Sequence, residues 1–576
     1  MNKADLAHHF NTLSSDWDIL VKVLLFLFLF LLVNVFIYDR YVQRKNQLLI
    51  NYPLIGRLRY IFYALRNPMR QYFGDETFYD SFEKIEWINR VAQKKSPYLS
   101  FSPAKPYANS ELLFKYTNHV KEPSEVTEDF HVTFGPRRTK PFTARSIVGR
   151  SAMSDGSISP EGTRAFARGA YSAGFPINTG EGGLTSNFLT TLKYSECNEA
   201  FLEVKHGTPL ARSVKAIVRF FTNKEVARRI YRKMVLRRKD KGTFIFDEEG
   251  TNYFRINWDA DLASFPEEVP ESVPDMILQM GSGLYGVRDK EGVFDAERYQ
   301  KVMRFCRMSE VKIAQGAKQT GGKLLAAKVS EDIAYYRGVP AHQDLISPNR
   351  FPYAGSMEEL YDFIERLQRL SQKPVGFKTI VSSREQFEEY VRALAKRKEE
   401  GKEIVDFITI DGGDGGSATA PLEMMSRIGL PIQEALEIVD DTLKAYGLRE
   451  EIVVVAAEKV LTPDDVVELL CYGADFVNIA RGFMISAGCI RARECSGANG
   501  RHCPVGLATM DEGKRSKFLI EKKSRTVANY HNALIEGVRN LMAVMGKARI
   551  REFSKEDLML RETHHHPEAN PPMERG

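Results

Sequence analysis

The sequence predicts an α/β protein, a (β/α)8 TIM barrel with an N-terminal transmembrane helix and a basic insertion. Three observations predict this architecture. From about residue 145, short apolar runs alternate with helical periodicity, which indicates a parallel sheet. Eight or so such units over roughly 350 residues fit a closed barrel, with an open doubly wound sheet as the alternative. A continuous apolar stretch also lies close to the N-terminus.

Composition limits the classes of function. The chain has 576 residues, of which 27% are charged and 43% hydrophobic, as in an ordinary globular protein. A net charge of +6 is too small for this length to indicate a nucleic-acid binder. Six cysteines do not make a disulfide framework in so long a chain, and they favour a reducing compartment.

Residues 19–38 are apolar except for Lys22 and Asn34, and about 20 such residues span a bilayer. A cleaved signal peptide is the alternative, although no small-residue cleavage site follows. Lys and Arg dominate after the stretch and not before it, so the positive-inside rule predicts a single-pass membrane protein with its catalytic part in the cytoplasm. The basic residues that follow are Arg40, Arg44, Lys45, Arg57, Arg59, Arg66 and Arg70.

The chain divides into four predicted parts. Residues 1–45 are an N-terminal tail and transmembrane anchor, and 46–130 are a packed preamble. The barrel occupies 131–512, with an insertion at about 189–270. Residues 513–576 are C-terminal helices and a flexible tail.

The predicted elements of the barrel follow one another in a regular order. The strands are 146–150, 175–178, 276–280, 311–314, 344–347, 375–380, 407–410, 453–457 and 476–480. The helices are 160–173, 296–308, 356–369, 383–398, 432–446 and 462–472.

The insertion is strongly basic. Twelve Lys and Arg residues lie between 212 and 241, among the apolar residues Val214, Ile217, Val218, Phe220 and Phe221. A basic amphipathic helix beside a membrane anchor suits an anionic lipid surface. A solvated charged face is the alternative interpretation.

Small and glycine-rich loops follow most of the predicted strands. They lie at 151–157, 178–183, 281–286, 317–323 and 411–417. Glycine permits close approach of the backbone, and successive N–H groups can cradle a phosphate. One such loop is explained by a turn, but several at the same end of successive strands predict a site for a large anionic ligand.

The last strand leads into a loop with three thiols, Cys489, Cys495 and Cys503. Closely spaced cysteines in one loop are typical of a metal site. The position after a strand and the corner at Arg481 and Gly482 is where parallel α/β proteins bind ligands. The hypothesis is that a flavin phosphate and an iron–sulfur cluster lie close together here.

Seven motifs then follow a known family in order. They are Ala152-Met-Ser-x-Gly-Ser-Ile158, Asn178-Thr-Gly-Glu-Gly-Gly183, Gln315-Gly-Ala-Lys318, Leu345-Ile-Ser-Pro-Asn-Arg350, Lys373-Pro-Val-Gly-Phe-Lys378, Ile410-Asp-Gly-Gly-Asp-Gly-Gly416, and Gly473-Ala-Asp475 through Cys503-Pro-Val-Gly506. The chain resembles the FMN-binding glutamate synthase family, the stand-alone form of the synthase domain. The match covers roughly 45–75 and 131–545.

The resemblance implies FMN at the C-terminal end of the barrel and a 3Fe–4S cluster. It places Cys489, Cys495 and Cys503 on the cluster, and Glu181, Lys318 and Lys378 in catalysis. A lysine near a flavin can stabilise the reduced, anionic ring, and a cation can hold a dicarboxylate. The implied cofactor-binding residues are Ala152, Met153, Ser154, Gln279, Lys378, Gly412, Gly413, Gly415, Gly416, Lys459, Arg481 and Gly482.

The sequence departs from the family pattern at several positions. Seven residues separate Cys495 from Cys503, where four are usual, and Asp155 replaces an aromatic residue. Glu458 replaces a glycine that usually lies beside the phosphate, and a carboxylate there costs energy unless Lys459 or Arg481 compensates. The chain also shows no amidotransferase domain and no dinucleotide-binding module, so an electron-donor protein or a quinone-side donor is expected.

The leading hypothesis is therefore a membrane-anchored, flavin-dependent oxidoreductase that reductively aminates 2-oxoglutarate, or a related 2-oxo acid, to an amino acid. Its expected partners are this substrate, an electron donor and the membrane, with no nucleic acid. Asp155 and Glu458 motivate a second hypothesis, a non-catalytic or electron-transfer subunit of the same fold. A related flavoenzyme acting on another amino or keto acid is the third.

Overall fold

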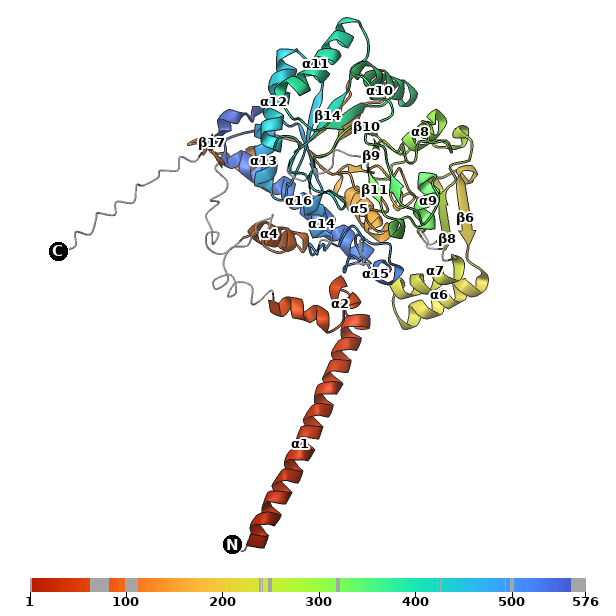
Figure 1. Ribbon diagram of the computed structural model, residues 1–576, viewed down its shortest axis with the longest axis vertical. Helices are drawn as coiled ribbons and strands as arrows, with labels where there is room; N and C mark the ends of the chain where they lie inside the picture. Colours follow the sequence, from red (N-terminus) through yellow and green to blue (C-terminus); the bar gives the residue numbers. More distant parts are fainter. Residues whose placement is uncertain are drawn as a thin grey trace, which may run out of the picture.

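Eight parallel strands close into a barrel, as the sequence predicts (Figure 1). The computed structural model describes residues 3–62, 82–98, 112–237, 240, 242–246, 251–316, 322–421, 423–424, 427–492, 494–497 and 502–560, with the side chains of 3–18, Phe82, Glu225 and Leu560 left aside. In sheet order the strands are β10 (Met308–Lys312), β13 (Val375–Thr379), β14 (Phe407–Asp411), β15 (Val453–Ala457), β16 (Phe476–Ile479), β4 (Val148–Arg150), β5 (Ile177–Asn178) and β9 (Met276–Met280).

The strands form where the sequence is apolar without alternation. All residues of β14 are buried, as are four of the five in β15, because helices cover the outside and packed side chains fill the inside. Register places Ile408 beside Val454 and Ile410 beside Ala456. The ends of neighbouring strands are therefore level, and their loops meet at one face.

Capped helices form the outer layer. They are α5 (Pro160–Ala173), α8 (Ala296–Met303), α10 (Met357–Ser371), α11 (Arg384–Glu399), α12 (Ile432–Ala445) and α13 (Pro463–Cys471). Ser159 caps α5 ahead of Pro160, and Gly174 ends it in the left-handed conformation (φ 77°). The predicted helix boundaries agree with the structure within two residues except at α8, which ends at Met303, five residues before the predicted end at 308, because the chain turns there to begin β10.

A hairpin closes the N-terminal end of the barrel. It consists of β2 (Val132–Phe134) and β3 (Phe142–Ala144). Phe134 is fully buried and meets the rings of Phe407 and Phe476 edge to face at 5.5 and 5.6 Å. Because this end is plugged by aromatic packing, a ligand has access only to the opposite end.

Two predicted strands need correction. The prediction of 344–347 as a barrel strand is wrong, because β12 (Leu345–Ile346) pairs antiparallel with β11 (Lys323–Leu324) outside the barrel. Ile346 is 71% exposed, whereas a strand of a parallel barrel is buried on both faces. The strand predicted at 311–314 is β10, which runs from Met308 to Lys312. The prediction missed its first half because that half contains the polar residues Ser309 and Glu310.

The insertion folds into a small sheet and a helical hairpin. The sheet contains β6 (Leu202–His206), β8 (Asn252–Ile256) and β7 (Ile245–Phe246), and the hairpin contains α6 (Pro209–Phe221) and α7 (Lys224–Val235). The basic segment predicted as one helix is thus two helices. Buried Ala211, Tyr231 and Tyr253 join the hairpin to the sheet.

The N-terminal helix projects from the globular part (Figure 1). It comprises α1 (Lys3–Ile37), continued by the π-helical η1 (Tyr38–Val42), and is followed by α2 (Gln47–Asn51). Within the described part of the chain, one helical segment is long and apolar enough to cross a bilayer, Ile19–Val42.

C-terminal helices complete the core beside α4 (Phe82–Ala92). They are α14 (Arg481–Ser486), α15 (Glu512–Arg515) and α16 (Ile520–Val544), while β1 (Leu112–Phe114) pairs with β17 (Leu558–Leu560). His531 of α16 stacks on Phe175 at 4.6 Å and bonds to Ser146 at 2.8 Å. Burial lowers the pKa of His531 to about 4, so this imidazole is a neutral part of the core.

Candidate active site

A buried carboxylate forms the floor of the site inside the barrel. Glu310 of β10 is 1% exposed and accepts three hydrogen bonds. Asn178 Nδ2 and Gln279 Nε2 donate to Oε1 at 2.9 and 2.6 Å, and Thr409 Oγ1 donates to Oε2 at 2.5 Å. Four strands are thereby tied together by charge-assisted bonds, which fixes the end of the barrel interior.

An ion pair lies next to this floor. Lys378 Nζ of β13 is 2.9 Å from Asp411 Oδ1 of β14, and both side chains are buried. Burial favours the neutral amine, but attraction by Asp411 and then Glu310 outweighs it and raises the pKa of Lys378. Asp411 Oδ2 also accepts from the backbone N–H of Gly316 at 2.7 Å, so the loop after β10 is attached to β14.

A second acid–base pair lies at the mouth. Glu181 Oε2, in the loop after β5, is 2.8 Å from Lys312 Nζ at the end of β10. Lys312 also donates to Gln315 Oε1 at 2.8 Å. Lys318, the third predicted catalytic residue, lies outside the described residues. Glu181 is only half-buried, so it is accessible to a ligand in the mouth.

Buried arginines hold the small-residue loop in place. Arg150 donates to the carbonyls of Ser151, Met153 and Asn178, at 3.2, 3.0 and 2.8 Å. Arg337 donates to Ser154 Oγ at 3.3 Å from the other side. Ala152, Met153 and Ser154 are therefore half-buried residues with a fixed backbone at the mouth.

Asp155 takes part in that support. Its Oδ2 accepts from Thr185 Oγ1 at 2.7 Å and from Asn187 Nδ2 at 2.6 Å. Burial raises the pKa of Asp155, although these two bonds oppose the rise. The residue that replaces the family's aromatic side chain thus joins the loops after β4 and β5.

Cationic side chains gather around the ends of β14, β15 and β16. Lys459 Nζ is 3.0 Å from Asp414 Oδ2, and a side-chain carbon built on Gly416 would lie 3.5 Å from the Arg481 guanidinium. Burial, followed by repulsion from Arg481, lowers the pKa of Lys459 to about 8 despite the ion pair. These residues form a polar rim where an anion would find two positive charges.

The predicted glycines play different parts in this rim. Gly412 and Gly413 donate their N–H groups to the carbonyls of Ala457 and Leu430, at 3.3 and 2.7 Å, and Gly415 donates to Gly412. Gly482 is packed against the Tyr530 hydroxyl, with no space for a side chain. The N–H groups of Gly412, Gly413 and Gly415 are therefore used to hold the loop after β14 in shape.

Glu458 is the unusual group of the rim. Its side chain is 4% exposed and fills the space beside the Cα of Gly412, and its Oε2 has no hydrogen-bond partner among the described residues. Burial, then repulsion by Asp414 and Asp411, raises the pKa of Glu458 to about 8. The carboxyl is consequently mostly protonated at neutral pH and can donate a hydrogen bond.

The three predicted cluster ligands come near one another. Burial raises the pKa of Cys489 to about 11, opposed by a hydrogen bond from the Arg491 N–H and reinforced by Cys495 and Cys503. All three are free thiols. No three Cys, His, Asp or Glu side chains in the described segments lie close enough to hold a single metal ion. The cluster therefore stays a prediction.

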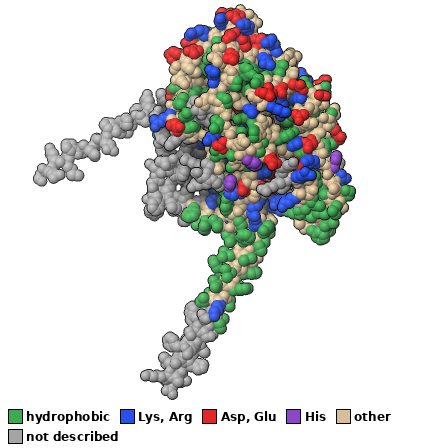
Figure 2. Space-filling view, turned by 45° about the vertical axis from the view of Figure 1, so that its right-hand side comes forward, with side chains coloured by type: hydrophobic (Ala, Val, Ile, Leu, Met, Phe, Trp, Pro, Cys, Tyr) green, Lys and Arg blue, Asp and Glu red, His purple; other side chains and the backbone are tan. Residues whose placement is uncertain are grey.

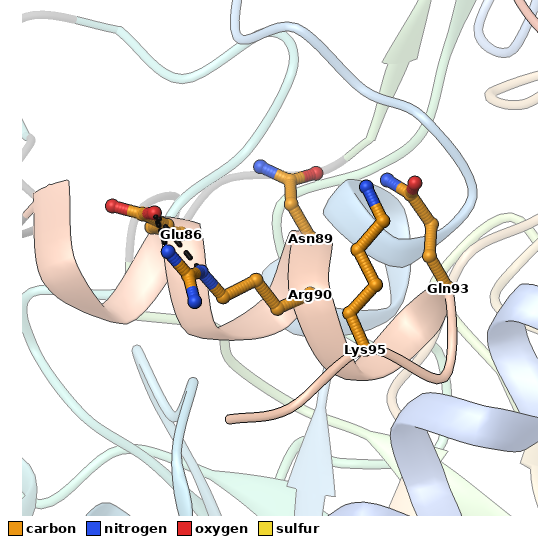
Figure 3. Close-up of a pocket in the computed structure, with 5 residues that line it drawn as sticks. All are labelled: Glu86, Asn89, Arg90, Gln93 and Lys95. Carbon is orange, nitrogen blue, oxygen red and sulfur yellow. Dashed lines mark hydrogen bonds and ion pairs between the residues drawn. The ribbon is translucent and has the colours of Figure 1, made fainter. Parts of the chain in front are cut away.

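A separate cavity of about 390 Å³ lies on α4, away from the strand ends (Figure 3). Glu86 and Arg90 form an ion pair at its edge, at 2.8 Å, with Asn89, Gln93 and Lys95 beside them. Its lining contains no residue of the barrel, so it is not part of the candidate site.

The structure brings most of the predicted residues to one end of the barrel. Gln279 and Lys378 lie at or next to the floor, Glu181 lies at the mouth, and Lys459 and Arg481 lie on the rim. Sequence reasoning missed Glu310, Lys312 and Asp411 as site residues. A charged side chain inside an apolar strand run was the available signal for Glu310.

Comparisons with known proteins agree on one family. A family model described as a conserved region in glutamate synthase matches residues 92–548. The glutamate synthase large subunit-like protein YerD of Bacillus subtilis is 32% identical over 563 residues, 90% of each chain. The archaeal-type NADPH glutamate synthase of Thermotoga maritima is 30% identical over 284 residues, and this match spans 52% of that enzyme and 49% of this chain.

A solved flavocytochrome b2 variant with sulfite bound also aligns over 90% of both chains. Its TM-score is 0.40 and its identity 13%. So distant a likeness bears on neither the fold nor the site.

Proposed function

Because the chain belongs to the glutamate synthase family, we propose that it is a membrane-tethered, FMN-dependent oxidoreductase with an iron–sulfur cluster. In this proposal it reductively aminates 2-oxoglutarate, or a related 2-oxo acid, to the amino acid. The observation that carries the proposal is the convergence of the Lys378–Asp411 pair, the Glu181–Lys312 pair and the cationic rim at the open end of the barrel.

The residues present fit FMN. The half-buried loop at 152–154, with the small side chains of Ala152 and Ser154, would leave room for a flat ring, and Gln279 and Lys378 would be available as hydrogen-bond donors. Lys459 and Arg481 supply positive charge for a phosphate. Glu458 does not oppose this fit, because a carboxyl with a pKa of about 8 is neutral at pH 7 and its free oxygen is available for a hydrogen bond.

The cofactor and the side chains of the site then have distinct roles in the proposed reaction. FMN held at this site would supply the hydride-transfer chemistry that reduction of a substrate imine requires. Lys378 stays protonated and places a positive charge where negative charge develops. Glu181 lies at the accessible end of its ion pair, where it can accept or return a proton, and Lys312 orients it. Lys318 is proposed to bind the substrate carboxylate.

The cluster is proposed on Cys489, Cys495 and Cys503. Thiolates are the usual ligands of iron–sulfur clusters, and the neighbouring Cys495 and Cys503 help to raise the pKa of Cys489. Replacing Cys495 by Ser should remove iron from the purified protein. Cys306 is a buried free thiol in the segment between α8 and β10, and Cys306→Ser is the matched control that should leave the iron content unchanged. Equal iron in the wild type and in Cys495→Ser would refute the assignment.

The proposed location is the cytoplasmic side of a membrane, with Ile19–Val42 as a single span. The proposed source of electrons is a donor protein or a quinone-side donor. The experiment that tests the reaction is reoxidation of the photoreduced protein by 2-oxoglutarate with ammonia, followed by absorbance. Rapid reoxidation with formation of glutamate is expected, and no change with a panel of 2-oxo acids would contradict the proposal.

A second candidate is an electron-transfer or non-catalytic subunit of the same fold. Glu458 favours it, because its side chain occupies the space beside Gly412 that a phosphate-binding loop usually leaves open. In that case reduced protein would be reoxidised by a partner protein and by no 2-oxo acid.

A further inference from the structure

The α6–α7 hairpin exposes an apolar face that nothing in the described structure covers. Leu210, Ile217 and Phe221 follow the spacing of one helical face, with Phe220 beside them. Phe220 and Phe221 are 83% and 78% exposed and touch each other, with ring centres 5.2 Å apart. The opposite face is used for folding, since Ala211 and Tyr231 are buried against the insertion sheet.

The same hairpin is basic. Residues 209–235 contain eight Lys or Arg and a single Glu. Some of these cations serve the fold, such as Arg232 beside buried Glu161 at 3.5 Å and Arg228 beside Glu521 at 3.1 Å. Others extend into solvent around the apolar face: Arg212, Arg219, Lys224 and Lys233. A solvated charged face alone would not explain two adjacent exposed phenylalanines at the tip.

The hairpin lies on the side of the molecule from which α1 projects (Figure 1). Figure 2 shows hydrophobic side chains gathered low on that side, near the base of the apolar helix. A charged, basic surface with apolar side chains at this place matches the chemistry of a lipid interface more closely than that of a protein partner.

The attachment of α1 to the globular part is firm. Arg57 binds Asp39 through two bonds of 2.8 and 2.6 Å, and Arg40 donates to the carbonyl of Ile50 at 2.7 Å. Asn51 donates to the carbonyl of Pro504 at 2.8 Å, in the loop of the proposed cluster. The Arg57 and Arg40 bonds join the end of the helix to residues 50–57, and the Asn51 bond joins that segment to the barrel domain. A spanning α1 would therefore hold one defined side of the domain towards the bilayer.

We propose that the α6–α7 hairpin is a second membrane contact, with Phe220 and Phe221 inserted at the headgroup–acyl boundary and the exposed Arg and Lys residues against anionic lipid headgroups. The inference rests on the proposed span for its orientation. The hairpin would then be an interfacial element that determines the orientation of the barrel relative to the membrane.

The test uses the full chain in vesicles, with Phe221 replaced by the photoreactive residue p-benzoylphenylalanine. Vesicles of equal parts phosphatidylcholine and phosphatidylglycerol should give a lipid adduct at this position after irradiation. The matched control places the same residue at Lys396 of α11, which is well exposed at the opposite end of the molecule and should give no adduct. Equal adducts at the two positions, or none at 221, would overturn the proposal.

Charge is tested separately. Vesicles of phosphatidylcholine alone, or the variant Arg212→Gln/Arg219→Gln, should give several-fold less adduct at 221. Unchanged yields would refute the anionic-lipid part, and a protein–protein adduct of twice the mass would assign the face to a second copy. Resistance of the vesicle-bound protein to extraction by alkaline carbonate tests the α1 span alone. Extraction of the protein would contradict the proposed span, whereas the lipid adduct at 221 tests the hairpin contact.

Discussion

Two buried carboxyl groups of the candidate active site differ in how completely their oxygens are hydrogen-bonded. Glu310 on the floor uses both oxygens, with three donors from three other strands. Glu458 on the rim leaves Oε2 without a partner in the described structure and faces Asp414 and Asp411. The floor is thus complete without a ligand, whereas the rim has a polar group that a ligand can satisfy.

The electrostatic surroundings explain the difference. Glu310 attracts the protonated Lys378 of the neighbouring strand β13, and its charge is compensated. Glu458 lies in a region of negative charge, and its nearest cation, Lys459, approaches Oε1 only to 3.6 Å and is engaged by Asp414. Stability should therefore depend on the floor, and ligand binding and pH response should depend on the rim.

Removing the floor carboxylate should have the largest effect. Glu310→Ala leaves three buried donors without an acceptor, and we expect a loss of about 3–5 kcal/mol in the free energy of unfolding. Thr409→Val removes one of the three bonds and should cost about 1 kcal/mol. Denaturant unfolding of the full chain in detergent measures both. A loss below that of Thr409→Val would contradict the role of Glu310.

The rim should produce a pH dependence of stability. The folded pKa of Glu458, about 8, lies above its ordinary value of 4.5, so between these values the folded state holds a proton that the unfolded state has lost. Stability from this group is therefore present below pH 4.5 and is lost as the pH rises towards 8, by at most about 1.4 kcal/mol per pH unit.

Glu458→Gln supplies the comparison. The difference in unfolding free energy between wild type and variant should shift in favour of the variant as the pH rises from 4.5 to 8. Thermal melts across this range are sufficient to measure it. A difference that stays constant with pH would show that Glu458 is ionised throughout.

A smaller effect is expected at Asp414. Asp414→Asn removes one repulsive charge from Glu458 and should lower its pKa, while it also removes the partly exposed ion pair with Lys459. The net change in stability at pH 7 should stay within about 1 kcal/mol. The informative measurement is the pH midpoint of the Glu458 effect, which should move down. An unchanged midpoint would exclude Asp414 as a cause of the raised pKa.

The sequence predicts the barrel well because its strands are buried on both faces. β15 is a continuous apolar run and β14 is apolar except for Thr409 and Asp411. The neighbouring helices α11 and α13 start directly after the N-cap residues Ser383 and Thr462. The same rule places β10 too late, since Ser309 and Glu310 look unsuited to a buried strand. The sequence therefore does not identify Glu310 as a site residue. Its three hydrogen-bond donors come from other strands and are brought to it only by the fold.

The sequence predicts which residue types form the site, but it predicts the roles of some of them incorrectly. The sequence predicts that the N–H groups of Gly412 and Gly413 are available to a phosphate. In the structure they donate to the carbonyls of Ala457, at the end of β15, and Leu430, in the loop before α12. The sequence predicts that a negatively charged Glu458 would repel a phosphate. In the structure, burial raises the pKa of Glu458 to about 8, so its carboxyl group is mostly neutral at pH 7. Both corrections depend on contacts between residues far apart in the chain, which no local pattern contains.

The central claim is that this barrel end binds FMN between the floor and the rim. The most direct measurement is the absorbance spectrum of the full-length protein, purified in detergent after expression with riboflavin and iron, with identification of any released flavin. We predict FMN near one equivalent per chain, retained at pH 7 and lost progressively above pH 8 as Glu458 ionises and Lys459 loses its proton, with a smaller loss above pH 8 in Glu458→Gln, where only Lys459 titrates. A colourless, flavin-free protein that also fails to take up added FMN would contradict the claim.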